Sequence, residues 1–252
     1  MLPERLDYLA DALMVWADTP KLNLMPRLLQ EWQKVEPMFR QLRGTQRAPV
    51  RLSDLSLKPD GGVQNIIKVW NTATAAEQDY WSDWYLDAHH VVQEIAERHQ
   101  LPIPVVAAVV AILSPGNLWW INVRIADKLI LFWKNKALSL LGKLSAYPFN
   151  VRKAIGVLEG ADPAQAIGSP KVGVFYDSLV DPIGTAEHLT LDGHAINIWS
   201  GYKVPLNQVR RLNEALRRKI ESDYTKAAQQ LGVSAQALQV LTWYVWRSVV
   251  PQ

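Results

Sequence analysis

Apolar residues recur along most of this chain at the three- and four-residue intervals that place side chains on one face of an α-helix. The two-residue alternation of a half-buried β-strand is hard to find. The pattern therefore predicts an all-α protein. After residue 62 it predicts helices over the ranges 63–71, 76–99, 102–113, 117–134, 149–158, 207–231 (which a break can divide) and 234–249.

An N-terminal helical layer is predicted to precede these helices. Its first helix is marked by apolar residues from Leu6 to Trp16, and its second by those from Leu24 to Phe39. A polar loop from Arg43 to Gly62 follows, with three glycines and two prolines. We place a boundary in this part of the chain. Residues 1–75 are expected to form an N-terminal extension with its loop, and residues 76–252 the main region.

Capping residues mark the starts of three later helices. Asp162 and Ser169 are each followed by a proline, which suits the first position of a helix, so these two sites bracket a tight helical hairpin. Gly232 can end the penultimate helix, and Ser234 can cap the last one.

The composition is that of a folded protein, with 49% hydrophobic and 20% charged residues. The longest apolar stretch, Leu101–Leu113, is too short to cross a bilayer and contains two prolines, so no membrane span is expected. The first residues are partly acidic where a signal peptide would be basic. We therefore expect the protein in the cytoplasm.

Several kinds of chemistry are excluded by the inventory. The chain has no cysteine, which rules out disulfides, thiolate zinc sites, iron–sulfur clusters and a cysteine nucleophile. His89 and His90 are adjacent, so on a helix they point in different directions and cannot form a metal-binding pair. We expect neither a metal nor a cofactor.

The net charge of +3 permits a polyanionic partner without establishing one. Basic residues are concentrated between Lys203 and Lys226, a stretch that contains seven basic and three acidic residues. The alternative for this stretch is an ordinary solvated helix face.

Two short motifs carry the strongest functional signal, the hairpin Ile167-Gly-Ser-Pro-Lys171 and the segment Leu191-Asp-Gly-His-Ala195. A hairpin that ends in glycine and lysine, followed about twenty residues later by Asp-x-His, resembles the helix-hairpin-helix DNA glycosylases. Here the hairpin has one glycine where two are typical, and a proline precedes the lysine. The resemblance implies a two-lobed, helical catalytic region over residues 76–252.

Further motifs resemble a phage-associated branch of that superfamily, which is linked to hypermodified phage DNA bases. The branch includes excising glycosylases and base-modifying relatives. The likeness extends from Trp81 to Arg247. Its motifs are Leu113-Ser-Pro, Trp119 or Trp120, Asn122, Asn150-Val-Arg-Lys-Ala154 and Trp243-Tyr-Val-Trp-Arg247.

Asp192 is the expected catalytic carboxylate. Cleavage of an N-glycosidic bond builds positive charge on the sugar, which a fixed carboxylate stabilises, or the carboxylate activates water as a general base. Both roles need Asp192 ionised. The alternative is that Asp192 only caps the helix that follows it.

Lys171 occupies the position at which bifunctional relatives keep an amine that attacks the sugar and leads to strand cleavage. Such an amine must be neutral, which requires burial or nearby cations. The alternative is a lysine that contacts a phosphate. Because exposed amides at a tight turn bind phosphate, the hairpin is also expected to hold DNA. The expected DNA-binding residues are Gly168, Ser169, Lys171, Gly173 and His194.

A flipped base needs flat apolar partners and amide groups that read its edge. The chain has eleven tryptophans, several of them clustered. For any one of these tryptophans, packing in the core is the alternative. The candidates for the base pocket are Trp81, Trp84, Asn117, Trp119, Trp120 and Asn122.

These features together predict a DNA glycosylase that acts on double-stranded DNA, with no protein partner predicted. The resemblance implies a modified pyrimidine, such as glucosylated hydroxymethylcytosine in phage DNA, and an antiviral role. Three alternatives stay open: a transferase that attaches an amine to an activated hydroxymethyl pyrimidine in DNA, a non-catalytic DNA-binding module, and an enzyme that repairs ordinary lesions.

Overall fold

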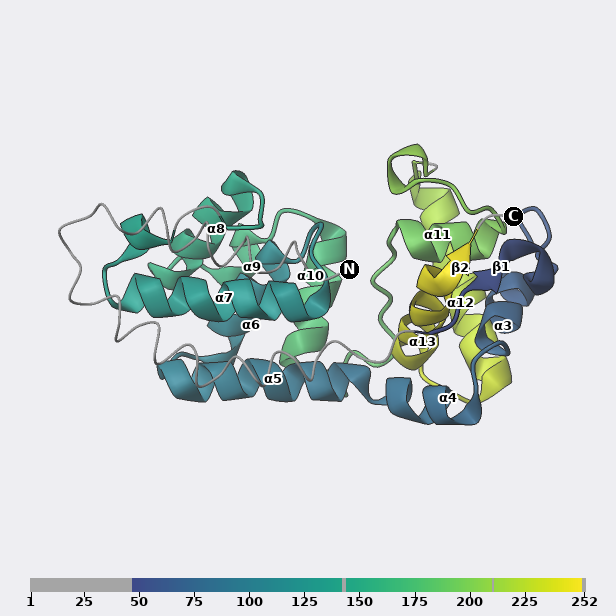
Figure 1. The fold of residues 1–252 in the computed structure, drawn as a ribbon, viewed down its shortest axis with the longest axis horizontal. Helices are drawn as coiled ribbons and strands as arrows, with labels where there is room; N and C mark the ends of the chain where they lie inside the picture. Colours follow the sequence, from purple (N-terminus) through teal and green to yellow (C-terminus); the bar gives the residue numbers. More distant parts are fainter. Residues whose placement is uncertain (1–46, 142–143, 210, 251–252) are drawn as a thin grey trace. The chain divides into compact units, whose positions relative to one another are not determined.

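The computed structural model describes residues 47–141, 144–209 and 211–250, and these residues form two compact units (Figure 1). One unit, which we call the inserted unit, contains residues 95–167. The other, the split unit, combines residues 47–94 with residues 168–250. The described chain is mostly helical, which confirms the predicted helical class. Its described strands are β1 (Val50–Arg51) and β2 (Val249–Val250), which pair in parallel.

The inserted unit is organised around α6 (Ile103–Leu113). This helix is apolar on all sides, and every residue from Val106 to Leu113 is buried, as expected for a helix at the centre of a core. Helices α7 (Trp119–Lys134), α8 (Pro148–Leu158) and α9 (Pro163–Ala166) pack against it. A short 3-10 helix, η2 (Leu138–Leu140), follows α7.

One buried carboxylate ties this unit together at the end of α5 (Trp84–His99). Asp127 is 2% exposed, and its Oδ1 atom lies 2.7 Å from Nη1 of Arg98 and 2.8 Å from Nε2 of His99. A buried carboxylate with two such partners is satisfied, so Asp127 is structural.

The split unit is organised around α13 (Ala235–Ser248), whose residues Leu238, Leu241, Val245 and Trp246 are fully buried. The helices α3 (Val63–Trp70), α4 (Ala75–Ser82), α11 (Gly193–Ser200) and α12 (Glu214–Leu231) pack against it. Its remaining elements are the first part of α5 as far as Glu94, α10 (Pro170–Val180), η1 (Leu52–Leu55), η3 (Leu206–Gln208) and the two strands.

The single helix predicted over 76–99 is wrong in one respect, because the chain leaves helical geometry at Asp83 and forms α4 and α5. Helix α4 has its own start, a capping box between Thr74 and Glu77. Trp81 before the break and Tyr85 after it are both buried in the core of the split unit. The apolar pattern therefore continues across the break and conceals it.

The other helix ends agree with the sequence signals more closely. Asp162 caps α9, Ser234 caps α13, and Gly232 ends α12 in the left-handed conformation. Ser169 precedes α10, but its side chain makes no capping hydrogen bond. The range 207–231 is broken, because α12 begins only after Asn213, which caps it.

The split unit includes part of the predicted N-terminal extension. The stretch from Val50 to Trp70 packs with α11, α12 and α13, and β1 pairs with β2 near the end of the chain. The helices predicted between residues 6 and 39 lie outside the described residues.

Among the described residues, no single helix has the length and apolar character needed to cross a bilayer. Helices α5 and α6 pass that test only as a pair, and they are bent by 118° relative to each other.

Candidate functional site

Asp192 caps α11, so the capping role considered from the sequence is real. Its Oδ1 atom accepts hydrogen bonds of 2.9 Å from the backbone amides of His194 and Ala195. Within the described part of the chain, the second carboxylate oxygen has no hydrogen-bond donor. Asp192 is also only partly buried. The cap therefore fixes the carboxylate and leaves one oxygen available for chemistry.

The loop that leads to Asp192 is anchored on α13 by a buried glutamine. The side chain of Gln239 accepts a hydrogen bond of 2.9 Å from the amide of Thr190 and donates one of 2.5 Å to its carbonyl oxygen. Together these bonds satisfy both backbone groups of Thr190, as a strand partner would.

A second glutamine of α13 holds the chain farther upstream. The side-chain amide of Gln236 donates to Oγ of Ser178 and to the carbonyl and hydroxyl oxygens of Thr185, at 2.7–3.0 Å. It thereby connects α10 to the loop that carries Asp192.

The residue after Asp192 lies close to two apolar side chains. A Cβ atom on Gly193 would lie 2.8 Å from Leu206 and 3.3 Å from Val209, which pass over the start of α11. The motif glycine thus packs closely against the segment at 205–209, although the exposed Leu206 side chain could move to admit a larger residue.

Two buried tyrosines lie close enough to Asp192 for its charge to act on them. Burial raises the pKa of Tyr85 to about 12, its hydrogen bond with Thr190 lowers it, and the charge of Asp192 raises it. Burial likewise raises the pKa of Tyr224 far above its ordinary value, and Asp192 adds to that effect. Both phenols therefore remain neutral beside the carboxylate.

His194 lies on the first turn of α11, where several charges act on it. Burial lowers the pKa of its imidazole, Asp192 opposes that shift, and the positive charges of Lys203, Arg247 and Lys171 lower it further. Its Nδ1 atom is buried and has no hydrogen-bond partner among the described residues. His194 is therefore neutral at pH 7.

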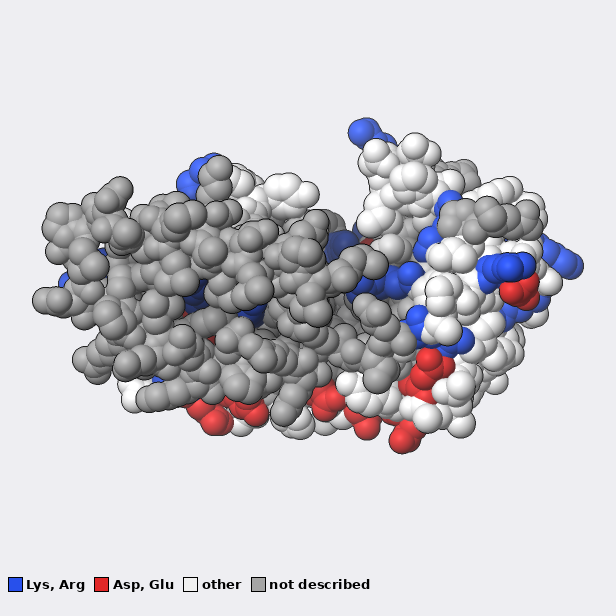
Figure 2. All heavy atoms as spheres, viewed as in Figure 1, with Lys and Arg blue, Asp and Glu red and all other residues white. Residues whose placement is uncertain are grey.

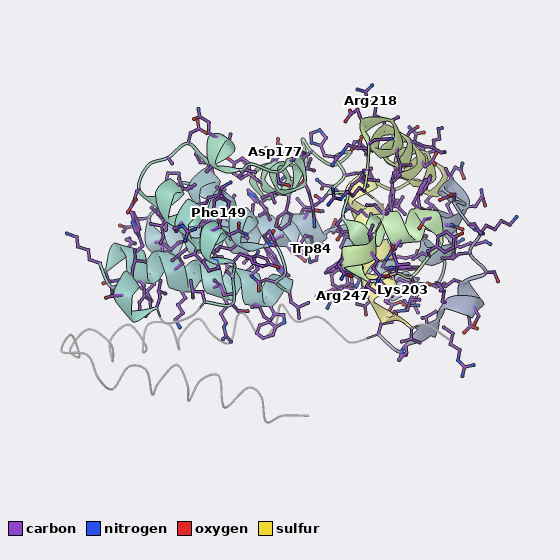
Figure 3. All side chains as sticks on the ribbon, turned by 90° about the horizontal axis from the view of Figure 1, so that it is seen from above. Trp84, Phe149, Asp177, Lys203, Arg218 and Arg247 are labelled. Atoms are coloured by element: carbon purple, nitrogen blue, oxygen red, sulfur yellow. The ribbon has the colours of Figure 1, made fainter. Side chains whose placement is uncertain are left out.

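Two cations stack on tryptophans of α13 near His194. The guanidinium of Arg247 lies 4.8 Å from the centre of the Trp243 ring, and the ammonium of Lys203 lies 4.9 Å from that of Trp246. Lys203 also donates a hydrogen bond of 2.6 Å to the carbonyl oxygen of Trp246. Figure 3 labels both cations, which lie close together on the split unit.

The hairpin between α9 and α10 presents backbone amides. Among the described residues, the amides of Gly168, Ser169, Lys171 and Val172 have no hydrogen-bond acceptor. The amide of Gly173 donates to the carbonyl oxygen of Ser169 at 2.9 Å, so this predicted DNA-binding residue has no free amide to offer. Free amides at the start of a helix attract anions.

Lys171 is exposed at the start of α10. An exposed ammonium suits contact with a phosphate better than it suits a desolvated amine nucleophile. The position therefore favours the second of the two roles considered from the sequence.

The six residues predicted for the base pocket are not gathered in one unit. Trp81 and Trp84 belong to the split unit, and the other four belong to the inserted unit. Trp81 is 8% exposed and packs on Tyr244 with ring centres 4.5 Å apart, so the core alternative holds for it.

The two asparagines of that set also bond to the backbone. The buried side chain of Asn122 donates to the carbonyl oxygen of Val110, and Asn117 donates to that of Leu113. Their amide groups hold α6 and the turn after it. Trp84, Trp119 and Trp120 are partly exposed.

Part of the predicted basic stretch is an ordinary solvated face. Arg217, Arg218 and Lys219 of α12 pair with Glu221, Glu214 and Asp223, respectively, at 3.0–3.3 Å. Figure 2 shows Lys and Arg side chains on the visible face of the split unit around α11 and α13, and Asp and Glu side chains along the lower edge of the view, where α5 and α4 lie.

The described chain is thus a helical protein in which a capped carboxylate lies beside a histidine and several cations. It belongs to a family of unknown function (DUF7178), whose model matches residues 51–249. No curated protein and no solved structure matches the chain.

Proposed function

We propose that this protein is a DNA N-glycosylase that excises a modified base from double-stranded DNA and leaves an abasic site. The observation that carries the proposal is the geometry of Asp192. One carboxylate oxygen is fixed by two backbone amides, and the other has no donor among the described residues. A carboxylate held in this way can stabilise positive charge on the sugar or activate a water molecule, without having to reorganise first.

The surroundings of Asp192 support a polyanionic substrate. Lys171, Lys203 and Arg247 all lie within electrostatic reach of His194, and the hairpin adds free amides at the start of α10. Such groups bind the phosphates that flank a nucleotide. The proposal is therefore a site in which the sugar is attacked while its neighbouring phosphates are held.

The substrate class comes from the sequence resemblance alone. We propose a modified pyrimidine, with glucosylated hydroxymethylcytosine in phage DNA as the leading example. In a cell, abasic sites would block the replication of an invading genome, and unmodified host cytosines would escape if the pocket demands the added group.

The test is the formation of abasic sites in phage DNA that carries glucosylated hydroxymethylcytosine, beside unmodified DNA. Wild type is expected to form abasic sites only in the modified DNA. Asp192→Asn is expected to lower the rate by about 10²- to 10⁴-fold, because it removes the charge. Asparagine caps helices as well as aspartate does, so this variant should keep its unfolding temperature.

Asp192→Ala serves as the structural comparison, since it removes the charge and the cap together. Equal activity of Asp192→Asn and wild type would reduce Asp192 to a helix cap. If no DNA yields abasic sites and a heavier nucleoside appears, the protein is a transferase. Trapping a covalent adduct with borohydride, lost in Lys171→Ala, would assign strand cleavage to that lysine.

A further inference from the structure

We propose that Lys203 and Arg247, together with the imidazole of His194, form a binding site for a phosphoryl group beside Asp192. The site residues predicted from the sequence include Asp192, His194 and the hairpin, but neither Lys203 nor Arg247. The inference rests on the proposed function in taking the phosphodiester backbone of DNA as the expected source of that group.

The first support is the arrangement around Trp243. Arg247 lies over the face of its ring at 4.8 Å, and the His194 ring meets it edge-on at 6.2 Å with an angle of 75°. A guanidinium that stacks on an aromatic face keeps its N–H groups in its own plane, where they can bind two phosphate oxygens. Arg247 and His194 thus both contact the ring of Trp243, which places them near each other.

The second support is the fixed position of Lys203. Its ammonium is placed by the face of the Trp246 ring and by one hydrogen bond to the carbonyl oxygen of Trp246. An ammonium has three N–H donors, so two remain for a ligand. The pKa of Lys203 is lowered by burial and by the charge of Arg247, which shows that these two cations lie near one another.

The third support is an excess of positive charge around His194. Among the described residues, Lys171, Lys203 and Arg247 make no ion pair, whereas three cations of α12 each pair with an acidic residue four positions away. Asp192 supplies one negative charge to this neighbourhood. Cations that are held together without counter-charges are a binding site for an anion.

The ligand is assigned to the phosphoryl class by the chemistry of the donors that share this neighbourhood. A guanidinium, an ammonium and an imidazole all offer N–H groups, which suits a tetrahedral group with several acceptor oxygens. The group can belong to the DNA backbone or to a free phosphate or pyrophosphate. A backbone phosphate bound here would hold its sugar next to Asp192.

The experiment measures binding to a fluorescent 20-base-pair duplex at several salt concentrations, with Asp192→Asn as the common background so that no base is released. Arg247→Gln and Lys203→Gln are compared with Arg218→Gln, which removes the same charge from an exposed ion pair on α12. Inorganic phosphate and pyrophosphate are tested as separate probes through tryptophan fluorescence.

If the backbone is the source, each site variant is expected to weaken binding about tenfold at low salt. It should also reduce the salt slope by about 0.9, the value for one phosphate contact. The double variant should weaken binding by less than the product of the single effects, because both cations hold one group. Arg218→Gln should stay near the parent.

If DNA binding is unchanged but pyrophosphate binding is lost in the variants, the phosphoryl group comes from a free ligand. If neither probe distinguishes the site variants from Arg218→Gln, the inference is wrong. Because Lys203 also bonds to α13 and its variant can lose stability, the His194 ring signals of the wild type are followed by NMR as each probe is added. Signals that move with none of the probes would contradict the site.

The outcomes separate this inference from the proposed function. Site-dependent DNA binding without abasic sites in any DNA would disprove the glycosylase and leave the phosphoryl site standing. If Arg247→Gln and Lys203→Gln, made with Asp192 intact, form abasic sites as fast as wild type does, the glycosylase stands and the phosphoryl site is disproved.

Discussion

Asp192 is held by the same two hydrogen bonds that begin α11, so one side chain provides both a helix start and an oriented carboxylate. The sequence predicts some of the residues around Asp192 and misses others. His194 and Lys171 belong to recognisable motifs. Lys203 belongs to no motif, and Arg247 ends the motif Trp243-Tyr-Val-Trp-Arg247 without a predicted role. Their place near His194 depends on how α11 and α13 pack, which local spacing does not encode.

The protonation of His194 gives a prediction at this scale. Burial and neighbouring cations lower the pKa of its imidazole below the ordinary value of 6.5. As the pH falls through 6.5, the unfolded chain takes up this proton before the folded chain does, so the folded state loses stability. The contribution is complete above pH 6.5 and is lost as the pH falls toward the folded pKa.

We therefore expect wild type to lose more stability between pH 7 and pH 5 than His194→Asn does, as measured by urea unfolding. An NMR titration of the imidazole should reach its midpoint below pH 6.5. A midpoint above that value would show that Asp192 outweighs burial and the cations.

At the scale of elements, side chains of α13 hold the loops and cations that surround the candidate site. Two of its glutamines hold loops: Gln236 bonds to the upstream loop, and Gln239 bonds to the loop before Asp192. Two of its tryptophans hold the cations: Trp246 contacts Lys203, and Trp243 contacts Arg247. The sequence predicted this helix and its cap from periodicity and Ser234. It could not assign the glutamines, because a buried glutamine becomes informative only when its backbone partner is known.

Replacing Gln239 tests this support. Gln239→Leu leaves the amide and carbonyl of Thr190 buried without partners, at a cost of about 1–3 kcal/mol for each unsatisfied group. We expect a lower free energy of unfolding and a lower rate of base release, since Asp192 lies two residues after Thr190. Chemical denaturation and the abasic-site assay measure the two effects.

Gln229→Leu on the exposed side of α12 is the matched control, and it should change neither quantity appreciably. If Gln239→Leu unfolds no more readily than this control, α13 does not hold the loop.

At the scale of the whole molecule, the split unit is built from two stretches of chain that the inserted unit separates. Composition suggested a boundary in the loop that ends at Gly62, because glycine, proline and polar residues gather there. Yet the next helix, α3, packs with helices near the other end of the chain. Loop composition shows where the chain leaves regular secondary structure. It does not show which helices will pack on the apolar face of α3, because those helices lie far along the sequence.

This arrangement predicts an order of folding. The described part of the inserted unit is one stretch, residues 95–167, so it can fold before residues 168–250 have been synthesised. Ribosome-bound chains that are arrested far enough beyond residue 167 for the inserted unit to have left the exit tunnel should already resist proteolysis within that unit. Residues 50–70 should remain cleavable until the full chain is released. Protection of both segments at the same length would contradict this order.

The pairing of β1 with β2 has a further consequence for biosynthesis. At about 5–20 residues per second, roughly 6–36 s separate the emergence of α3 from that of α11, α12 and α13, which it packs against. During that interval the apolar residues of α3 have no partners, and a segment of eight residues does not form a stable helix by itself. Val50 pairs with Val249, so the strand pairing at the two edges of the family match, residues 51–249, can form only after residue 249 has been synthesised.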